Sequence, residues 1–433
     1  MIQKSMTLTP DGALAFGGAD VRALAAKYGT PLYILDENRL RENMRGYLTS
    51  MRAAFGPGAL PTYASKALCF KGIYRILAEE GLGADVVSGG ELYTALKAGF
   101  PMEKVFFHGD HKADWEIELA LDSGVGCFMA DSEFELENIE RICAARSARA
   151  RVILRLTPGI DSHTFAAVNT GKVDVQFGRP LETGQALSFV KTALSMAHID
   201  LAGYHCHIGS QIFTEGPFFL AAEKMLAFVK QAKDETGFEP ECLDLGGGFG
   251  VRYVESDPVI DIPACIAVLG EKVKKLCAQH GLKTPDIIME PGRSIVADAG
   301  MTLYSAGAVK HIDGHRTYVI VDGGMSDNPR YALYGSAYTV YNASRMTAEA
   351  DMKCTIAGRC CESGALIQEN VVIPAPERGD LIAVGVTGAY NYSMASNYNR
   401  LTRLPIVMVK DGADRLAVRR ETLDDLIRCD MDE

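Results

Sequence analysis

Pro61-Thr62-Tyr63-Ala64-Ser65-Lys66 is the first of eight short apolar runs that decide the fold of this chain. Seven more follow in order, at residues 84–88, 105–109, 126–131, 152–156, 202–209, 243–248 and 286–293. Stretches with apolar residues at spacings of three and four lie between them, most clearly at 72–80, 91–98, 218–233 and 263–279. A strand followed by a helix, repeated eight times, predicts an α/β fold of the TIM-type (β/α)8 barrel. An open doubly wound sheet gives a similar alternation and is the alternative.

The pattern changes after Gly300. Short β-like runs separated by Gly, Pro and Asp lie at 303–312, 317–321, 354–357, 371–373, 381–384, 405–409 and 416–419. They predict a second, mostly antiparallel β-barrel domain, to which residues 32–35 can add a strand. We therefore expect residues 37–299 to form the barrel, and residues 1–36 and 300–433 to form the β-domain.

The composition narrows the class of protein. The 433 residues are 48% hydrophobic and 23% charged, which is typical of a globular protein of two domains. A net charge of −11 argues against a nucleic-acid partner. No apolar run approaches the roughly 20 residues of a membrane span, and no signal-peptide core follows Met1. The 11 cysteines are scattered without a C-x-x-C pair, which favours reduced thiols in a cytoplasmic enzyme.

Polar groups gather at the ends of the predicted strands, where a barrel carries its active site. Lys66 ends the first run, and a lysine amine can form a Schiff base with an aldehyde once its pKa is lowered. Glu290 ends the eighth run, and a carboxylate beside a pyridine nitrogen favours the protonated ring. The alternatives are a solvated lysine and a salt bridge between Glu290 and Arg293. Together the two residues suggest a pyridoxal phosphate site.

The sixth and seventh runs end in His205-Cys206-His207 and Gly246-Gly247-Gly248-Phe249-Gly250. Imidazole and thiolate are zinc ligands, but Cys206 faces away from its neighbours on a strand, so we expect no metal. The glycines allow backbone N–H groups to approach a phosphate, although a tight turn would use them equally. They are neither a dinucleotide fingerprint nor a P-loop, so an NAD-dependent oxidoreductase is disfavoured.

Seven motifs, in order along most of the chain, resemble the diaminopimelate decarboxylase family. This family comprises fold-type III pyridoxal phosphate enzymes with an alanine racemase-like barrel. The motifs are Tyr63-Ala64-Ser65-Lys66-Ala67, His205-Cys206-His207-Ile208-Gly209-Ser210-Gln211, Gly246-Gly247-Gly248-Phe249-Gly250, Glu290-Pro291-Gly292-Arg293, Asp322-Gly323-Gly324-Met325-Ser326-Asp327-Asn328-Pro329-Arg330, Cys361-Glu362-Ser363-Gly364 and Thr387-Gly388-Ala389-Tyr390.

The resemblance implies a role for each matching residue. Lys66 would hold pyridoxal 5'-phosphate as a Schiff base, His207 would stack on its ring, and Glu290 would pair with its pyridine nitrogen. The residues around the phosphate would be Ser210, Gly247, Gly248, Gly292 and Tyr390. The distal carboxylate of the substrate would be held by Arg293, Arg330 and Tyr334, and Tyr390 would also contact the substrate. A second subunit of a homodimer would supply Cys361 as proton donor and Glu362 for the distal ammonium group.

The implied reaction is decarboxylation of meso-2,6-diaminopimelate at its D-centre, which gives L-lysine and CO2 in lysine biosynthesis. The alternative is a sister decarboxylase for another basic amino acid or a carboxylated polyamine. A racemase lacks an evident second base, and a catalytically dead relative would not need to keep Lys66 and Cys361.

The chain departs from the family pattern at four places, which bear on substrate preference and on one loop. Ala365 replaces the usual Asp, and Tyr331 stands where proline is common. The usual Asp-Ser-Lys-Phe-Gly loop is Asp174-Val175-Gln176-Phe177-Gly178, and the usual His-Gly-Asn-Asn-Lys is His108-Gly109-Asp110-His111-Lys112.

Overall fold

The computed structural model describes residues 1–160 and 175–432, so Asp174 lies outside the described residues. The chain divides into two compact units. The barrel unit comprises Met44–Gly250 and Val259–Gly292, and the sheet unit comprises Met1–Asn43, Val251–Pro258 and Arg293–Glu433. The domain boundaries expected from the sequence stay a prediction.

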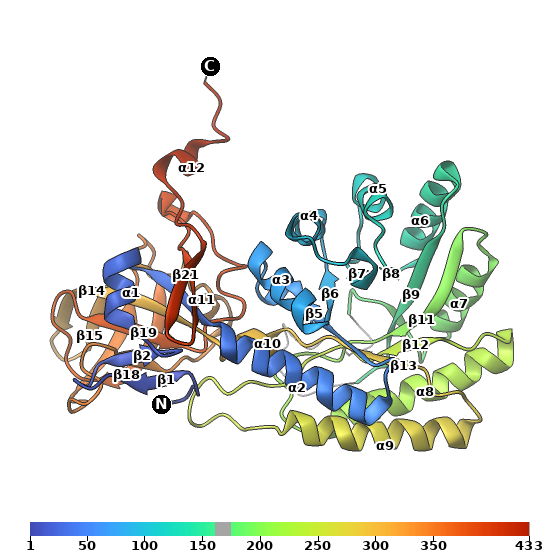
Figure 1. Cartoon of the computed structure of the whole chain (residues 1–433), viewed down its shortest axis with the longest axis horizontal. Helices are drawn as coiled ribbons and strands as arrows, with labels where there is room; N and C mark the ends of the chain where they lie inside the picture. Colours follow the sequence, from blue (N-terminus) through green and yellow to red (C-terminus); the bar gives the residue numbers. More distant parts are fainter. Residues whose placement is uncertain (161–174, 433) are drawn as a thin grey trace. The chain divides into compact units, whose positions relative to one another are not determined.

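The barrel unit holds eight parallel strands that close into a ring (Figure 1). In chain order they are β5 (Leu60–Ala64), β6 (Gly83–Val86), β7 (Val105–Phe107), β8 (Cys127–Ala130), β9 (Ala150–Thr157), β11 (Ile199–His205), β12 (Cys242–Asp244) and β13 (Asp286–Met289). The pairings of β8 with β9 and of β13 with β5 complete the ring. The predicted TIM-type barrel is therefore confirmed, and the open sheet is excluded. A short strand, β10 (Arg179–Pro180), pairs with β9.

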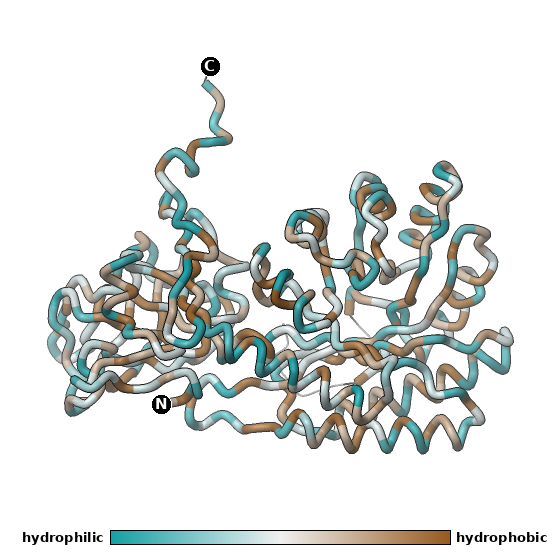
Figure 2. The backbone as a smooth tube through the Cα atoms, in the orientation of Figure 1, coloured by the Kyte–Doolittle hydropathy of each residue, from teal (hydrophilic) through white to brown (hydrophobic). Residues whose placement is uncertain are grey.

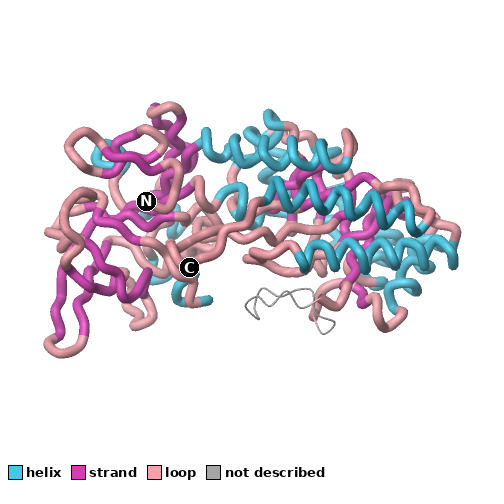
Figure 3. Tube along the Cα trace, turned by 90° about the horizontal axis from the view of Figure 1, so that it is seen from below, coloured by secondary structure: helices cyan, strands magenta, loops and turns pink. Residues whose placement is uncertain are grey.

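Helices cover the outside of the strands (Figure 3). They are the end of α2 (Glu37–Phe55), then α3 (Lys71–Glu80), α4 (Gly89–Ala98), α5 (Asp114–Ser123), α6 (Glu133–Arg146), α7 (Gln185–Ser195), α8 (Gly216–Thr236) and α9 (Ile262–His280). Side-chain N-caps start several of them, as where Ser132 accepts from the Glu135 N–H. Apolar and polar residues alternate along α8 and α9 in Figure 2, as expected for helices with one buried face.

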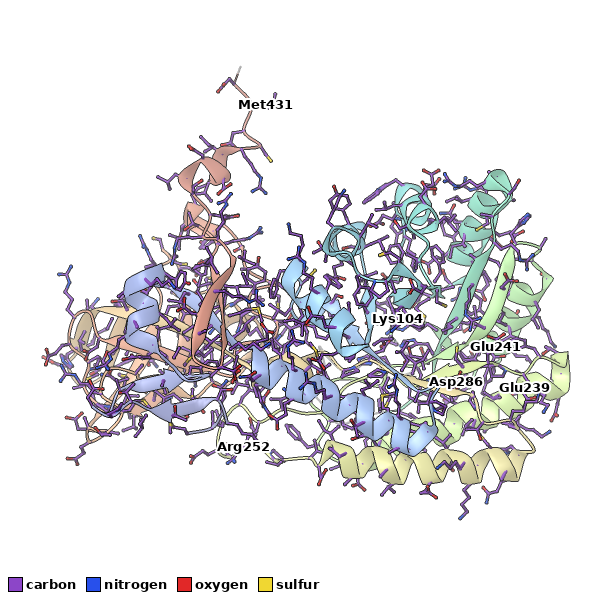
Figure 4. All side chains as sticks on the ribbon, in the orientation of Figure 1. Lys104, Glu239, Glu241, Arg252, Asp286 and Met431 are labelled. Carbon is purple, nitrogen blue, oxygen red and sulfur yellow. The ribbon has the colours of Figure 1, made fainter. Side chains whose placement is uncertain are left out.

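The two ends of the barrel strands differ in character. Lys104, Glu241 and Asp286, labelled in Figure 4, lie at the N-terminal ends, and Glu241 pairs with Arg151 at 2.8 Å. A layer of side chains from five neighbouring strands fills the interior: Cys127, Met129, Ile153, Ala202, Cys242 and Ile288. The barrel is therefore packed inside, and the residues of this unit that were predicted to hold a cofactor lie at the C-terminal ends of its strands.

The sheet unit is built mainly on a nine-stranded sheet. Its strands are β4 (Leu32–Asp36), β14 (Gly300–Ile312), β15 (Arg316–Val321), β16 (Val340–Asn342), β17 (Met352–Ala357), β18 (Leu366–Ile373), β19 (Leu381–Gly385), β20 (Ile406–Lys410) and β21 (Ala413–Val418). Only the β15–β17 and β20–β4 pairings are parallel, so the expected mostly antiparallel domain is confirmed. The predicted strand at residues 32–35 is β4, which pairs with β14.

Smaller elements complete the sheet unit. A three-stranded sheet consists of β1 (Met6–Leu8), β2 (Leu14–Phe16) and β3 (Ala19–Asp20), and the helices are α1 (Val21–Tyr28), α10 (Arg293–Val296), α11 (Arg330–Tyr334) and α12 (Leu423–Ile427). Side chains from both sheets share one core, which includes Phe16, Ile34, Leu303 and Val407. Within the described residues, no helix combines the length and apolar character needed to cross a bilayer.

Candidate active site

Lys66 lies two residues beyond the end of its strand, although the sequence pattern predicted that Lys66 is the last residue of that strand. The strand β5 ends at Ala64, and Lys66 sits in a 3-10 turn, η1 (Ser65–Ala67), with an exposed side chain. The Tyr63 hydroxyl donates to the Leu68 carbonyl oxygen at 3.0 Å, and the Tyr74 hydroxyl donates to Ser65 Oγ at 2.8 Å. These bonds fix the turn on both sides of Lys66, so its backbone is held while its amine is accessible.

Glu290 follows β13 and is buried between two histidines. His205 Nε2 lies 3.3 Å from Glu290 Oε2, and His108 Nε2 lies 2.8 Å from Glu290 Oε1. The second approach is close but poorly aligned, which leaves Glu290 Oε1 without a hydrogen bond of good geometry. Although burial alone would raise the pKa of Glu290, the two imidazoles hold it well below its usual value. Glu290 is therefore a carboxylate with capacity for one more donor.

His207 is a neutral, half-buried imidazole. Burial, with the positive charge of Lys66 as a second cause, lowers the pKa of His207 well below its usual value. Its Nδ1 accepts from the Gly247 N–H at 3.3 Å. A neutral ring with one nitrogen bound to the backbone can present its flat face to an aromatic ligand.

The glycines after β12 allow three chain segments to approach closely. A Cβ on Gly247 would lie 2.1 Å from the Glu290 carbonyl oxygen, and one on Gly248, with φ of +112°, would lie 2.4 Å from the Gly209 carbonyl oxygen. Ser210, half-buried, comes directly after Gly209. Gly292 lies beside the Lys66 turn, since a Cβ there would be 3.0 Å from Ala64 Cβ. The predicted phosphate residues of the barrel unit therefore surround the ends of β5, β11, β12 and β13.

The barrel unit fits pyridoxal phosphate. An accessible amine on Lys66 suits its aldehyde, the open acceptor Glu290 Oε1 suits a pyridinium N–H, and the neutral His207 suits its ring. Backbone N–H groups in glycine turns suit a phosphate.

Three side chains of types that can bind metal ions, His108, His205 and Glu290, lie within 4.8 Å of one another. Cys206, considered from the sequence, is not one of them. The 2.8 Å between His108 Nε2 and Glu290 Oε1 is a hydrogen-bonding separation. It is shorter than the roughly 3.3 Å between two ligands of a tetrahedral zinc ion. The cluster is therefore better described as a carboxylate with one hydrogen bond to His205 and a close polar contact with His108.

The sheet unit brings together the two predicted arginines and Tyr390. The Cζ atoms of Arg293 and Arg330 lie 4.8 Å and 4.9 Å from the centre of the Tyr390 ring. Both arginines are buried, and Arg330 Nε has no hydrogen-bond partner among the described residues. Arg330 also lies over the ring of the partly exposed Tyr334, at 5.1 Å. Two buried guanidinium groups on one ring form a concentrated positive site.

Cys361 and Glu362 are exposed on a turn of the sheet unit. The Cys361 N–H donates to Asn399 Oδ1 at 2.9 Å, and the Ala365 N–H donates to the Glu362 carbonyl oxygen at 3.0 Å. The turn is thus held by its backbone, and both side chains project to the surface. Ala365, where the family usually has Asp, is buried.

Several residues of these clusters escaped the sequence analysis. His108 lies next to the end of a predicted strand, so its position could have identified it, whereas Asp85 lies near the start of one; neither was assigned a role. Tyr253 lies in no recognisable sequence motif, yet its hydroxyl oxygen accepts a hydrogen bond from Arg293 Nη1 at 2.9 Å. Only the folded chain shows that contact.

Comparison with known proteins agrees with the geometry. The family model described as pyridoxal-dependent decarboxylase, pyridoxal binding domain, matches residues 41–297. The diaminopimelate decarboxylase of Bacillus methanolicus is 45% identical over 410 residues, which cover 95% of each chain. That of Bacillus subtilis (strain 168) is 44% identical over 420 residues, covering 97% of this chain and 95% of the relative.

A solved structure extends the likeness to three dimensions. The diaminopimelate decarboxylase of M. jannaschii, in complex with L-lysine, matches with a TM-score of 0.92 and 32% identity, over 100% of this chain and 99% of that one. The family model covers residues 41–297, and the likenesses in sequence and fold extend over 95% or more of the chain. The chain belongs to the diaminopimelate decarboxylase family of pyridoxal-dependent decarboxylases.

Proposed function

We propose that this protein is a pyridoxal phosphate-dependent enzyme that decarboxylates meso-2,6-diaminopimelate at its D-centre and releases L-lysine and CO2. Family membership supports the reaction class. The L-lysine in the M. jannaschii complex is the product that this reaction would release. The observation that carries the choice of substrate is the pair of buried arginines, Arg293 and Arg330, on the ring of Tyr390.

The arginine pair favours a substrate with a carboxylate at its far end. Two guanidinium groups within 5 Å of one ring centre repel each other, and a bound carboxylate relieves that repulsion. A guanidinium binds a carboxylate through two parallel hydrogen bonds, which fixes direction as well as position. Ornithine and L-lysine have only an amine at the end opposite their α-carbon, so they would leave this positive site unsatisfied. Tyr334, whose ring lies beside Arg330, would shape the same end of the site.

Lys66 would be the attachment point of the cofactor, and its displaced amine would later assist product release. Glu290 would accept a hydrogen bond from the pyridinium nitrogen, and His207 would hold the ring from one face. Pyridoxal phosphate, when bound, supplies an electron sink that stabilises the negative charge left on the substrate carbon as CO2 departs. The neutral state of His207 suits it, because a positive ring would repel a pyridinium.

The phosphate would be held by Ser210, Gly247, Gly248, Gly292 and Tyr390. Four of these belong to the barrel unit, and Tyr390 belongs to the sheet unit. The chain itself joins the two sets, because Arg293 directly follows Gly292.

A homodimer with shared active sites would complete the site. Cys361 and Glu362 are exposed on a turn whose backbone is hydrogen-bonded, so they are available to another subunit. The Cys361 thiol of the partner would give its proton to the substrate α-carbon, and Glu362 would hold the distal ammonium group. Trp115 and Phe134, 58% and 77% exposed at the starts of α5 and α6, offer apolar surface near the site end of the barrel.

All 11 cysteines are free thiols, which supports a cytoplasmic location. The net charge of −11 disfavours a nucleic-acid partner, and the ligand we expect is a small amino acid.

Substrate selectivity tests the proposal. The purified protein with pyridoxal phosphate is assayed with meso-diaminopimelate, ornithine and L-lysine, and kcat/KM is compared. We expect lysine release from diaminopimelate to exceed turnover of the other two substrates by at least about 100-fold, the worth of one buried charged hydrogen-bonding group. A preference for ornithine or L-lysine would contradict this choice of substrate and would indicate a related decarboxylase for another basic amino acid.

A further inference from the structure

Three carboxyl groups are buried together at the C-terminal ends of the barrel strands. Asp85 on β6, Asp244 at the end of β12 and Glu290 after β13 are 2%, 0% and 8% exposed. Burial raises the pKa of both aspartates, and the negative charge of Glu290 adds to that effect. A buried charge is costly unless it is paired or hydrogen-bonded. The polar groups around each carboxyl group therefore determine which of the three is ionised.

Only Glu290 receives an imidazole at each oxygen. His108 Nε2 lies 2.8 Å from Oε1, and His205 Nε2 lies 3.3 Å from Oε2. The two histidine rings meet edge to face, with 5.1 Å between their centres and 79° between their planes. Asp85 Oδ1 is farther from His108 Nε2, at 3.8 Å. Both histidines are buried, so they cannot turn to solvent for other partners.

We propose that His108 and His205 are positioning residues that keep Glu290 the ionised member of the three carboxyl groups and aim it at the pyridine nitrogen of the cofactor. The inference rests on the proposed function, because it takes Glu290 as the partner of that nitrogen. It assigns both histidines to the cofactor site through their contacts with Glu290. His108 is the first residue of His108-Gly109-Asp110-His111-Lys112, the segment that differs from the family pattern.

For His205, a neutral donor suits this task better than a cation. Burial lowers the pKa of His205 to about 4, so its Nε2–H donates to Glu290 without cancelling the charge. A lysine or arginine in its place would form an ion pair and weaken the attraction of Glu290 for a pyridinium. The charged and titratable groups that face this cluster are Lys66 after β5, Asp85 on β6, Arg155 on β9 and Asp244 on β12.

The loop that carries His108 is itself held firmly. Lys112 Nζ donates to the carbonyl oxygens of Gly109 and Met129 and to Glu135 Oε1, each at 2.9 Å. The His108 N–H donates to the Val86 carbonyl oxygen at 2.7 Å. His108 is therefore fixed by its backbone and by a buried anchor four residues later, as a positioning residue should be.

Cofactor affinity tests the proposal without relying on turnover. The dissociation constant of the full-length protein for pyridoxal phosphate is measured by equilibrium dialysis for His108→Leu, His108→Gln, His205→Leu and His205→Gln. Each leucine variant should weaken binding about 10- to 100-fold, as expected when a charged group loses a hydrogen bond, here from His205, or a close polar contact, here with His108. Each glutamine variant, which keeps an N–H donor, should stay within a few-fold of the wild type. His198→Gln is the matched control, because His198 pairs with Glu140 at 2.8 Å beside the opposite end of β11.

Combination with Glu290→Gln separates an action through Glu290 from general packing. In that background the leucine substitutions should have little further effect on cofactor binding, since the charge they act on is gone. Additive losses, or unchanged affinity in both leucine variants, would overturn the proposal. If circular dichroism shows that His108→Leu does not fold, the proposal is tested with His205→Leu and the two glutamine variants. Wild-type protein that binds no pyridoxal phosphate would instead refute the proposed function.

Discussion

The Arg330 guanidinium lies over the ring of Tyr390, with 4.9 Å between Arg330 Cζ and the ring centre. Arg293 approaches the same ring at 4.8 Å and is fixed by the Tyr253 hydroxyl. The Tyr253 ring in turn meets Tyr338 edge to face, with 5.5 Å between centres. The two charges are thus held in place before any ligand arrives, and a preorganised positive site loses little entropy on binding an anion.

Arg330→Lys should raise KM for diaminopimelate about 10-fold or more, because lysine keeps the charge but loses the planar fork. L-Lysine, which keeps the distal carboxylate of the substrate, should weaken in parallel as a product inhibitor. Steady-state kinetics and lysine inhibition constants measure both effects. Arg403→Lys, at a half-exposed arginine paired with Glu421, is the control. An unchanged KM for Arg330→Lys would refute the carboxylate role.

The buried His205 predicts acid sensitivity. Its pKa is about 4 in the fold against 6.5 when exposed, so the unfolded chain binds more protons between these values. The free energy of unfolding therefore rises with pH across this window, and about 3 kcal/mol is lost as pH falls through it. His205→Gln should remove that part of the pH dependence. Urea unfolding at several pH values from 6.5 to 4 measures it, with His198→Gln as control; parallel curves for wild type and His205→Gln would contradict the assignment.

Hybrid dimers test whether subunits share a site. Lys66→Ala and Cys361→Ala should each be inactive as homodimers. When the two are co-expressed, half of the dimers should be hybrids with one intact site of two, which gives about one quarter of wild-type activity. Separate affinity tags isolate the hybrid. A hybrid as inactive as its parents would show that Cys361 acts within its own subunit.

The buried ion pair of Lys112 and Glu135 should be costly to break from one side. Lys112→Met leaves Glu135 charged and unpaired, so the free energy of unfolding should fall by about 3–5 kcal/mol. Lys112→Met with Glu135→Gln should lose less, because no buried charge remains. Lys191→Met, in an exposed pair with Glu235, should cost under about 1 kcal/mol. Chemical unfolding compares the three; equal losses for the single and double variants would contradict the ion-pair explanation.

The periodic part of the fold could be predicted from the sequence. All eight barrel strands form close to their predicted positions, because apolar runs that are buried on both faces leave a strong pattern. Strand ends were less accurate. The sequence pattern predicts Lys66 and Arg293 at the ends of strands, but they lie in η1 and α10. The chain leaves the extended conformation where the apolar run gives way to polar residues. The short β16, three residues that pair with β19, carries too little pattern to detect.

The candidate site was predictable only where a motif marks it. Lys66, His207, Glu290 and the glycines stand out by residue type and by their place at strand ends. The contact of His108 with Glu290 depends on closing a ring of strands that are distant in the chain, so spacing does not reveal it. The same holds for Tyr253 under Arg293, which comes from a separate segment of the sheet unit.

Product stoichiometry is the most direct test of the central claim. Purified wild-type protein and Lys66→Ala are each loaded with pyridoxal phosphate and given meso-diaminopimelate, and L-lysine and CO2 are quantified. The wild type should release both in equal amounts, and Lys66→Ala should release neither. Equal turnover by Lys66→Ala, or a wild type that binds the cofactor yet forms no lysine, would contradict the account.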